Sequence, residues 1–349
     1  MSIGIVVVGP GLIGKKHIAL IRTNPDTHLA AIVAPDHAEN HVVAAAEGVP
    51  MFASLEQCAV ALAFDAVIIS SPNAFHYEQA RWCIENKIPV LIEKPVTPGI
   101  DEAKALVELV SAHDARVLVG HHRAYSPLLS AAQRLIQDER LGRLVSVVGS
   151  AQFHKPAQYF RDGPWRVQPG GGPILINMIH EIGNLRALMG EIATVQAIAS
   201  SAVRHFAVED TVAINFGFSN GALGTFMLSD TAATPMSWEQ TARENPAYPS
   251  YADVDCYTVS GTQGSLGFPT MRLRYFSAGT EASWWQPFKE EQVAVQREDP
   301  LQGQLEHFVE LTRGNAKPRV SVVDGYRNLL VIEAIRRAID SGKFETVGA

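Results

Sequence analysis

The sequence predicts an α/β protein of two domains, in which a doubly wound parallel sheet is followed by an α/β domain with a large, open, mostly antiparallel sheet. The 349 residues exceed what a single hydrophobic core usually organises. Short apolar runs alternate with helical segments over the first 120 residues. Beyond Arg123 the apolar segments become longer and alternate in polarity. We therefore expect one domain over residues 1–123 and a second over residues 124–349.

The N-terminal strands are brief and wholly apolar, as is typical of parallel strands buried on both faces. They are predicted at Ile3–Val8, Leu29–Val33, Ala66–Ser70, Val90–Ile92 and Val117–Val119. Helices are predicted between them, at Leu12–Ile21, Asp36–Gly48, Phe75–Glu85 and Asp101–His113. Strands that alternate with helices in this way form a parallel sheet wound on both faces.

The C-terminal strands alternate polar and apolar residues, which predicts an antiparallel sheet with one covered face. They are predicted at Val145–Phe153, Val195–Val203, Thr211–Phe218, Ala222–Leu228 and Tyr257–Ser260, with a hairpin turn at Ser219-Asn220-Gly221. Helices are predicted at Pro173–Met189, Leu301–Thr312 and Val322–Ile339, and residues 231–256 are predicted to form a long ordered loop.

Composition and charge argue against several classes of partner. The net charge is −7 and the basic residues are scattered, whereas a nucleic-acid surface needs a basic face. No apolar run approaches the roughly 20 residues of a membrane span. Cys58, Cys83 and Cys256 are far apart, and Met1-Ser2 leads into an apolar strand without the basic start of a signal peptide. We therefore expect a cytoplasmic protein without nucleic-acid or membrane partners.

A glycine-rich loop follows the first strand and opens the first helix. Gly9-Pro10-Gly11-Leu12-Ile13-Gly14 has the GxGxxG spacing of a dinucleotide-binding loop in a Rossmann domain. The first glycine permits a tight turn, the second lets the backbone approach a pyrophosphate, and the third lets the helix pack closely. Free N–H groups at the start of the helix attract the pyrophosphate. The loop predicts a nicotinamide dinucleotide bound by Gly9, Gly11, Leu12, Ile13 and Gly14.

The end of the second strand bears on the choice between NAD and NADP. A carboxylate for the ribose 2′-hydroxyl is expected about 20 residues past the glycine loop. That place holds Ala34, and Asp36 lies two residues later. No Arg or Lys stands nearby to hold a 2′-phosphate, although His37 is adjacent. We expect NAD in preference to NADP, with Asp36 on the ribose.

Further motifs, in order along the chain, resemble those of the Gfo/Idh/MocA family, the group of glucose–fructose oxidoreductase and inositol dehydrogenase. The matching segments are Ser71-Pro72-Asn73 with His76, Glu93-Lys94-Pro95, Gly120-His121-His122-Arg123 with Pro127, Trp165-Arg166, Gly170-Gly171-Gly172, His180 and Asp324-Gly325. The resemblance covers essentially the whole chain. It implies a Rossmann domain followed by an α/β domain with a large open sheet, and homodimers or homotetramers built through that sheet. It also implies sugar, polyol, inositol or sugar-acid substrates, and cofactor contacts from Ser71, Pro72, Asn73, His76, Glu93 and Lys94.

Lys94 is the first catalytic candidate. It lies near the carboxyl end of a predicted parallel strand, where ligands bind in such sheets. An ammonium there can hydrogen-bond the reacting oxygen and stabilise a developing alkoxide. The residue by itself is equally compatible with a solvated lysine paired with Glu93. The resemblance implies the catalytic role.

The predicted helix Pro173–Met189 carries the second catalytic candidate. Asn177, His180 and Asn184 form a polar stripe on an otherwise apolar helix. Buried polar groups need partners, which a polyhydroxy ligand would supply, although a satisfied core histidine is the alternative. The resemblance implies that His180 is catalytic, and we take Asn177 as the best candidate on this helix for a substrate contact.

The chain departs from the family pattern beside that histidine. Many members carry aspartates four residues before it and three residues after it, where this chain has Ile176 and Gly183.

Three further residues are candidates for substrate contact, namely Arg123, Trp165 and Arg166, because a guanidinium suits a carboxylate or several hydroxyls. The alternative for these arginines is an ion pair or a place beside the cofactor phosphates. No spacing of His, Cys or carboxylates suggests a metal site.

These residues together predict an NAD(P)-dependent oxidoreductase that moves a hydride between the nicotinamide and a carbon bearing a hydroxyl. His180 would take the hydroxyl proton, because histidine titrates near neutral pH, and Lys94 would hold the oxygen. Two alternatives stay open. One is an NAD-dependent glycosidase that oxidises its sugar transiently, and the other is a non-catalytic NAD(P)-binding sensor.

Overall fold

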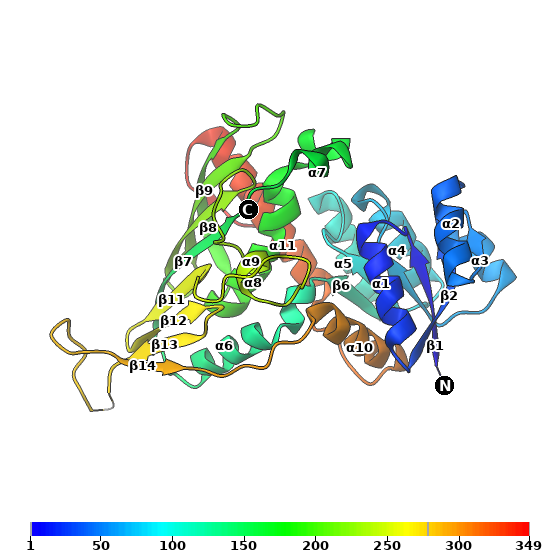
Figure 1. Ribbon diagram of the computed structural model, residues 1–349. Helices are drawn as coiled ribbons and strands as arrows, with labels where there is room; N and C mark the ends of the chain where they lie inside the picture. The colour runs from blue at the N-terminus through cyan, green and yellow to red at the C-terminus, as the bar shows by residue number, and fades with distance from the viewer. Residues whose placement is uncertain (1, 278, 349) are drawn as a thin grey trace. The chain divides into compact units, whose positions relative to one another are not determined.

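A computed structural model describes residues 2–277 and 279–348 (Figure 1). Two compact units are present: the chain up to His122 together with Pro300–Leu329, and Arg123–Asp299 together with the chain from Leu330 onward. The predicted division at residue 123 thus needs one correction, because residues 300–329 belong to the first unit. Helix α10 (Pro300–Arg313) explains the difference, since its Leu305 and Phe308 lie in the same hydrophobic cluster as the first strand.

The first unit contains a six-stranded sheet in which all neighbouring strands are parallel, as predicted. The order across the sheet is β3-β2-β1-β4-β5-β6. The strands are β1 (Ile3–Val8), β2 (Thr27–Val33), β3 (Met51–Phe52), β4 (Ala66–Ile69), β5 (Val90–Glu93) and β6 (Val117–Gly120). Parallel strands end at the same edge of a sheet, so the loops after β1, β4 and β5 lie side by side.

Helices cover both faces of this sheet. They are α1 (Leu12–Thr23), α2 (Ala38–Glu47), α3 (Leu55–Ala61), the 3₁₀ turn η1 (Asn73–Phe75), α4 (His76–Glu85), α5 (Ile100–His113) and α10. Ile5 and Ile68 of the sheet pack in one cluster with Ile18 of α1 and Phe308 of α10. Helices α4 and α5 pack against each other, contribute nothing to that cluster and cover the other face. The doubly wound arrangement is therefore confirmed.

The second unit contains a nine-stranded sheet of order β14-β13-β12-β11-β7-β10-β9-β8-β15. Its strands are β7 (Leu144–Gln152), β8 (Ile192–Ser200), β9 (Thr211–Phe218), β10 (Leu223–Ser229), β11 (Tyr257–Gly261), β12 (Gly264–Phe268), β13 (Arg272–Tyr275), β14 (Lys289–Gln292) and β15 (Glu345–Thr346). Only the pair β7–β10 is parallel among these strands, so the predicted mostly antiparallel sheet is confirmed. The predicted hairpin joins β9 to β10, with the Phe218 N–H donating to the Ala222 carbonyl at 2.9 Å.

Helices of the second unit cover one face of this sheet. They are α6 (Pro127–Gln137), α7 (Ala157–Arg161), η3 (Pro164–Val167), η4 (Ile174–Met178), α8 (Ile179–Met189), α9 (Trp238–Thr241) and the part of α11 (Val322–Ser341) from Leu330 onward, and η2 (His122–Tyr125) precedes them. Helices α6 and α8 pack against each other, and α8 contacts β7. The opposite face is exposed at Val148, Ile198, Leu223 and Met227. The sheet is open on that side, as its alternating sequence predicts.

Two predicted segments differ in detail. The predicted helix Pro173–Met189 is a five-residue π-helical turn, η4, followed by the regular helix α8. Hydrophobic periodicity does not separate the two forms over so short a stretch, and π turns are frequent at functional sites. The predicted loop 231–256 contains the short helix α9, whose Trp238 is buried.

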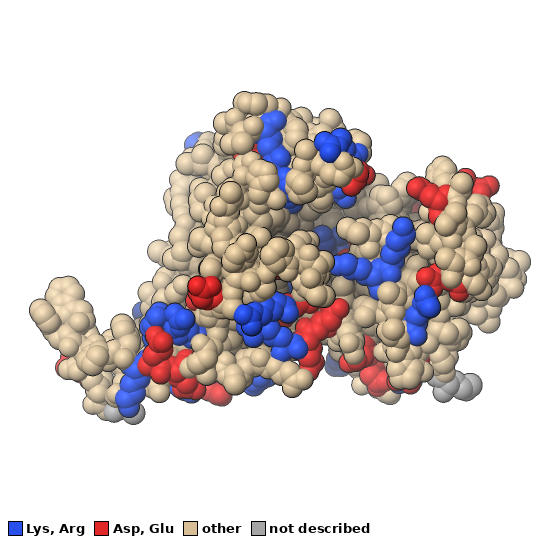
Figure 2. Space-filling model, viewed as in Figure 1, with Lys and Arg blue, Asp and Glu red and all other residues tan. Residues whose placement is uncertain are grey.

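Charged side chains are interspersed on the visible face of the molecule. Figure 2 shows blue and red groups next to one another among larger areas of other residues. No continuous basic surface is visible on this face. This distribution agrees with the scattered Lys and Arg of the sequence.

Candidate functional site

The three glycines of the loop after β1 have three different surroundings. Gly9 has a φ of +82°, and a Cβ there would lie 2.7 Å from the Cα of Ser71. A Cβ at Gly14 would lie 2.1 Å from the carbonyl oxygen of Gly9. A Cβ at Gly11 would meet nothing within 4 Å. Gly9 and Gly14 therefore shape the loop, whereas Gly11 leaves its backbone open to a ligand.

The start of α1 adds donors beside this opening. Gly11 is the N-cap and the helix begins at Leu12, whose side chain is exposed. The N–H groups of Leu12, Ile13 and Gly14 belong to the first turn, which has no intrahelical acceptor for them. Such a turn favours an anionic group. The open backbone at Gly11 and these donors fit a dinucleotide pyrophosphate.

Asp36 lies beyond the end of β2, where a ribose contact is predicted. Its carboxylate is largely exposed and accepts a hydrogen bond from Nε2 of His41 at 2.6 Å. His41 lies on α2 and was not among the predicted residues. The structure thus leaves Asp36 accessible, with a histidine in place of the Arg or Lys that a 2′-phosphate favours.

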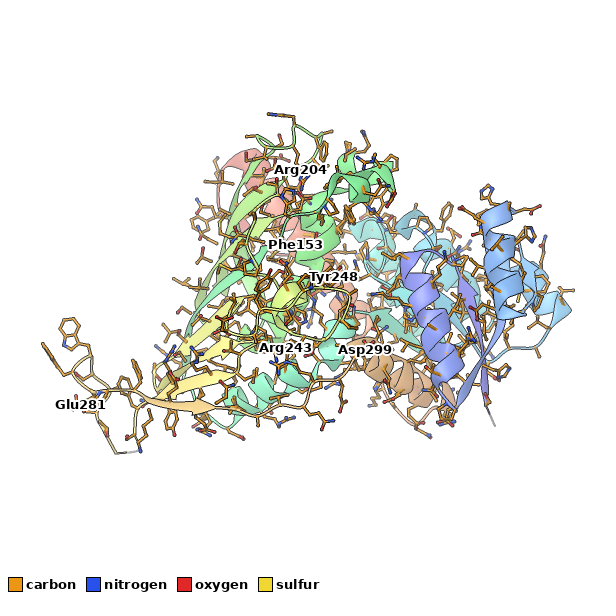
Figure 3. The ribbon with its side chains drawn as sticks, in the orientation of Figure 1. Phe153, Arg204, Arg243, Tyr248, Glu281 and Asp299 are labelled. Atoms are coloured by element: carbon orange, nitrogen blue, oxygen red, sulfur yellow. The ribbon has the colours of Figure 1, made fainter. Side chains whose placement is uncertain are left out.

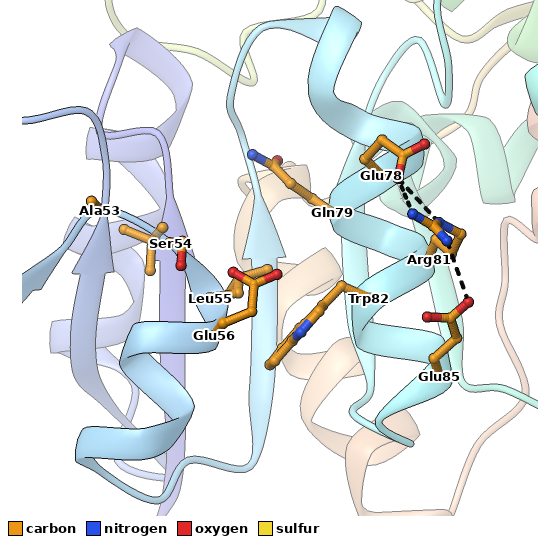
Figure 4. A pocket seen from close by; sticks show the side chains of 10 residues that line it. Ala53, Ser54, Leu55, Glu56, Glu78, Gln79, Arg81, Trp82 and Glu85 are labelled. Carbon is orange, nitrogen blue, oxygen red and sulfur yellow. Dashed lines mark hydrogen bonds and ion pairs between the residues drawn. The ribbon is translucent and has the colours of Figure 1, made fainter.

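A pocket of about 240 Å³ opens between the end of β2, the start of α3 and helix α4 (Figure 4). Val33 and Trp82 give it apolar walls, and Ser54 and Gln79 give it polar groups. Gln79 also accepts a hydrogen bond from the Ser71 hydroxyl at 2.6 Å. The pocket therefore adjoins the predicted cofactor segment Ser71-Pro72-Asn73, of which Asn73 begins the turn η1.

The cofactor contact of His76 stays a prediction, and the structure gives its ring two partners within the protein. The ring is buried, with Nδ1 2.8 Å from the carbonyl oxygen of Pro95 and Nε2 2.9 Å from that of Ser71. Burial lowers the pKa of His76, and a neutral imidazole can donate to only one of the two carbonyls. His76 therefore ties the loop after β4 to the loop after β5 and positions the residues around it.

Glu93 makes contacts within the first unit. Its buried carboxylate lies 2.8 Å from Nε2 of His17 on α1 and accepts the Lys94 N–H at 3.2 Å. Burial by itself raises the pKa of Glu93, but the contact with His17 and the nearby charge of Lys94 outweigh it and lower the pKa. Glu93 thus links β5 to α1, and its contact with the cofactor stays a prediction. His17 was missed because 76 residues separate it from its partner.

Lys94 stands where the sequence predicts it. It directly follows β5, at the edge of the sheet where the glycine loop follows β1 and Ser71 follows β4. β1, β4 and β5 are consecutive in the sheet. Lys94 is partly exposed, whereas Glu93 before it is buried. Its placement suits contact with a ligand at this edge.

The turn η4 and helix α8 hold the predicted polar stripe. Asn177 lies in η4 and His180 in the first turn of α8, and both side chains are about nine-tenths buried. Asn184 does not join them, because its amide donates to the Tyr257 hydroxyl at 3.1 Å in the interior. The stripe is therefore reduced to two residues, Asn177 and His180.

Lys155 is a buried cation beside this stripe that sequence reasoning missed. Its ammonium donates to Oδ1 of Asn177 at 2.7 Å. The same ammonium lies 4.8 Å from the ring centroid of Tyr159 and 5.5 Å from that of Phe153, which Figure 3 labels. A lone lysine past a strand gives no local sign of burial. The signal that could have found it is its place shortly after a strand, between the aromatic residues Phe153 and Tyr159.

Arg123 forms the ion pair that the alternative describes. Its guanidinium is buried between Glu181 at 2.6 Å and Glu239 at 2.5 Å, and it stacks over Trp238. Glu181 also accepts a hydrogen bond from the Tyr257 hydroxyl. The contact of Arg123 with a substrate stays a prediction.

Trp165 and Arg166 lie on the turn η3. Trp165 is exposed, and the guanidinium of Arg166 lies 3.9 Å from the ring centroid of Tyr159 and donates to the Tyr159 carbonyl. Arg166 and Lys155 thus contact the same aromatic ring. This brings Arg166 to the neighbourhood of Asn177, and Trp165 stays a prediction as a substrate contact.

Two family models match successive parts of the chain. The model described as "Oxidoreductase family, NAD-binding Rossmann fold" matches residues 3–121, and the model described as "GFO/IDH/MocA C-terminal domain" matches residues 129–267. The chain belongs to the Gfo/Idh/MocA family. The predictions of an NAD-binding Rossmann domain and of an oxidoreductase are thereby confirmed.

Members of this family match almost the whole chain. An inositol 2-dehydrogenase of Rhizobium meliloti is 21% identical over 97% of this chain and 97% of its own length. A scyllo-inositol 2-dehydrogenase (NAD⁺) of Bacillus subtilis is 24% identical over 96% of this chain and 94% of its own. A solved oxidoreductase from Agrobacterium radiobacter, in complex with NAD⁺, L-tartaric acid and magnesium, superposes with a TM-score of 0.82 at 16% identity, covering 100% of this chain and 99% of that one.

Ile176 and Gly183 occupy the two positions near His180 where many family members carry aspartates. Ile176 lies in η4, and Gly183 lies in α8.

Among residues 2–277 and 279–348, no three His, Cys, Asp or Glu side chains are grouped so that they could hold a metal ion. Within the same described residues, no helix is long and apolar enough to cross a bilayer.

Proposed function

We propose that this member of the Gfo/Idh/MocA family is an NAD-dependent dehydrogenase that oxidises a hydroxyl of a sugar, polyol, inositol or sugar acid. The observation that carries the proposal is the placement of Lys94. It follows β5 at the same sheet edge as the open glycine loop, and β5 lies two strands from β1. A lysine at that place suits an oxygen that becomes negatively charged during hydride transfer.

The first unit would bind the cofactor through groups that fit it. The open backbone at Gly11 and the first-turn N–H groups of α1 would hold the pyrophosphate, and Asp36 would accept from a ribose hydroxyl. The pocket beside Ser71 and Gln79 would hold the adenine-ribose end. When bound, NAD accepts the hydride, so the protein supplies position and charge.

The second unit would supply the proton acceptor. His180 is a buried histidine three residues after Asn177, and it would take the hydroxyl proton as general base. Lys94 would donate a hydrogen bond to the same oxygen. Asn177, held by Lys155 at 2.7 Å, would orient a neighbouring substrate hydroxyl. These roles are mutually consistent with an alcohol oxidation.

The substrate class rests on what relatives of similar length act on. The two full-length relatives named above are inositol dehydrogenases. Polar groups in the second unit, namely Asn177, Lys155 and Arg166, offer donors that suit a molecule with several oxygens. A small polyhydroxylated substrate is therefore the class we propose.

A substrate screen tests this function. The protein is mixed with NAD and a panel of aldoses, polyols, inositols and sugar acids, and NADH absorbance is followed. Lys94→Ala and His180→Asn should each lower kcat on the order of 100-fold or more, because each removes a group that acts in the transition state. Lys104→Ala, at an exposed lysine of α5, is the matched control and should keep full activity. With a sugar glycoside in the panel, release of the free sugar without NADH would instead favour the glycosidase, and tight NAD binding without either product would favour the sensor.

The proposal includes a homodimer or homotetramer built through the nine-stranded sheet. Its uncovered face carries Val148, Ile198, Leu223 and Met227, which lie on neighbouring strands and are exposed in one chain. Exposed apolar groups gathered on one sheet face favour association. Light scattering should give the mass of two or four chains, and Leu223→Lys with Ile198→Lys should reduce it.

The proposal also includes a cytoplasmic location. Cys58, Cys83 and Cys256 are buried as free thiols. Free thiols of this kind suit a reducing compartment. Fractionation of cells that produce the protein natively would test the location.

A further inference from the structure

Glu209 contacts the first residue of the turn η4. Its Oε1 accepts a hydrogen bond from the backbone N–H of Ile174 at 2.9 Å. Pro173 before it has no N–H, so the N–H of Ile174 is the first donor of this turn. A first-turn N–H has no acceptor within its own helix and depends on a group from outside. Glu209, which lies two residues before β9, supplies that group.

The glycine run before η4 lies against the same carboxylate. Gly172 has a φ of +79°, and a Cβ there would lie 2.7 Å from Oε1 of Glu209. A Cβ at Gly171 would lie 2.6 Å from the carbonyl oxygen of Trp165 on the turn η3. Glycine at these two positions therefore lets the chain approach both η3 and Glu209 closely.

The residue next to Glu209 leads to the other end of η4. The carbonyl of Asp210 accepts the N–H of Asp230 at 3.0 Å. The Asp230 carbonyl accepts the N–H of Lys155 at 2.9 Å, and the Lys155 ammonium donates to Asn177 at 2.7 Å. Asn177 is the fourth residue of η4. The turn is thus connected near both of its ends to the chain at residues 209–210.

A π-helical turn such as η4 depends on contacts from outside. π turns are rare, and they occur mostly as single turns within α-helices, frequently at functional sites. η4 runs directly into α8, whose second residue is His180. A change in the hydrogen-bond register of η4 would rotate Asn177 relative to His180, because a π turn contains more residues than an α-helical turn. The contact at the start of η4 therefore bears on both residues proposed to act on the substrate.

We propose that Glu209 is a positioning residue of the active site, whose carboxylate fixes the start of η4 and so holds Asn177 and His180 in the arrangement that alcohol oxidation requires. The inference rests on the proposed function and adds a residue to its site. Glu209 acts through the backbone of η4 and needs no contact with the substrate or the cofactor. Its removal should therefore slow the reaction without weakening cofactor binding.

The surroundings of Glu209 separate this role from general stability. Ile174 and Glu209 both line an open cavity of about 550 Å³, together with Arg336 and Asp340 of α11. Water in this cavity can accept from the Ile174 N–H when the carboxylate is removed. Loss of the carboxylate should therefore affect the order of η4 more than the stability of the whole unit.

Kinetics of three variants test the proposal, with NAD and myo-inositol or whichever panel compound is oxidised faster. Glu209→Ala should lower kcat on the order of 10- to 100-fold, since a small misplacement of a reacting group has an effect of this size, and change the Kd of NAD by less than about twofold. Glu209→Gln keeps an oxygen acceptor for Ile174 and should recover kcat to within about threefold of the unmodified protein. Glu281→Ala, at an exposed carboxylate of the same unit, is the control and should keep full activity.

A matched pair of glycine substitutions displaces the carboxylate without removing it. Gly170 and Gly172 both have a positive φ, +91° and +79°, so alanine strains the backbone at each. A Cβ at Gly170 would meet nothing within 4 Å, whereas one at Gly172 would meet Oε1 of Glu209. Gly172→Ala should therefore lower kcat further than Gly170→Ala, and most of that difference should vanish when Glu209 is also replaced by alanine.

Hydrogen exchange and histidine modification report the order of η4 without a substrate. In Glu209→Ala, the amides of residues 174–180 should exchange faster on the order of 10-fold, because this segment opens locally. Diethyl pyrocarbonate should modify the buried His180 faster than in the unmodified protein. The exposed His113 of α5 and the amides of the first unit should behave as before.

The possible outcomes distinguish the two proposals. A kcat within about threefold of the unmodified protein in Glu209→Ala would overturn the positioning role, as would faster exchange throughout the second unit together with a lower Tm. Activity that Glu209→Gln does not restore would also overturn it, because the proposed contact needs only an acceptor. Absence of NADH formation from every panel compound would count against the proposed function, and faster exchange confined to η4 would then still support the contact that holds it.

Discussion

Gly11 and Gly14 offer a direct test of how the dinucleotide loop is built. We expect Gly14→Ala to destabilise the first unit and Gly11→Ala to weaken NAD binding, with each variant largely sparing the other property. A methyl at Gly14 would lie 2.1 Å from the carbonyl oxygen of Gly9 and 2.8 Å from the Ser70 hydroxyl, whereas one at Gly11 would meet nothing within 4 Å. Each substitution adds one methyl group, which is crowded by neighbouring atoms at Gly14 and meets none at Gly11.

The magnitudes follow from these distances. Nonbonded atoms are comfortable at about 3.5–4.0 Å, so the backbone at Gly14 must move by more than about 1 Å. Overpacking of this kind costs about 1–3 kcal/mol, offset by up to about 1 kcal/mol of helix propensity. At Gly11 the φ of −74° suits alanine, so stability should change by less than about 1 kcal/mol. The methyl would stand in the path of the pyrophosphate, and loss of a charge-assisted hydrogen bond corresponds to on the order of 10- to 100-fold in affinity.

Calorimetric titration with NAD and thermal unfolding decide the matter. Gly14→Ala should lower the Tm by about 2–8 °C, the range that about 1–2 kcal/mol produces in a unit of this size. Gly11→Ala should unfold within about 3 °C of the unmodified protein. Unchanged NAD affinity in Gly11→Ala would refute the assignment of the open backbone to the cofactor. Unchanged Tm in Gly14→Ala would show that the loop tolerates a Cβ where the structure leaves none.

Three further predictions concern charged residues. Asp36→Ala should reduce the preference for NAD over NADP by about tenfold, because it removes both a ribose contact and a repulsion of the 2′-phosphate; titration with both cofactors measures it. Arg123→Leu should lower the free energy of unfolding, measured in denaturant, by about 3–5 kcal/mol, because Glu181 and Glu239 lose their buried partner. A variant of unchanged stability with a raised KM would instead indicate that Arg123 contacts the substrate. Burial raises the pKa of Glu181 to about 7, so the folded protein retains a proton that the unfolded chain loses above pH of about 4.5. Stability from this group is therefore lost as pH rises from about 4.5 to 7, and Glu181→Gln should make the pH dependence of unfolding shallower in this range; parallel pH profiles of unfolding would contradict it.

Local patterns carried most of the fold prediction. The parallel sheet follows from short apolar runs bounded by turns, and the glycine loop follows from a six-residue spacing in its strand-to-helix context. Lys94 could be placed because a residue directly after a parallel strand must lie at the carboxyl edge of the sheet. Such features depend only on residues that are close together in the chain, so they can be predicted from the sequence.

The contacts that the sequence did not indicate join residues far apart in the chain. Arg123, a substrate candidate, is paired with Glu181 and Glu239, which lie 58 and 116 residues away. Glu93 and His76 were cofactor candidates, but each makes buried contacts that join separate loops or elements. Helix α10 was assigned to the second domain, although its Phe308 packs into the core of the first unit. No local pattern records such pairings.

The sequence by itself thus determined the fold class, the family and the place of the cofactor loop, because strand periodicity and glycine spacing are properties of contiguous residues. The tertiary structure alone decided which charged side chains are paired with one another inside the fold. A guanidinium or an ammonium has the same sequence signature in either role. Its role is set by the distance to the opposite charge, and that distance exists only after folding. Arg123 with two carboxylates and Lys155 beside Asn177 are two such cases.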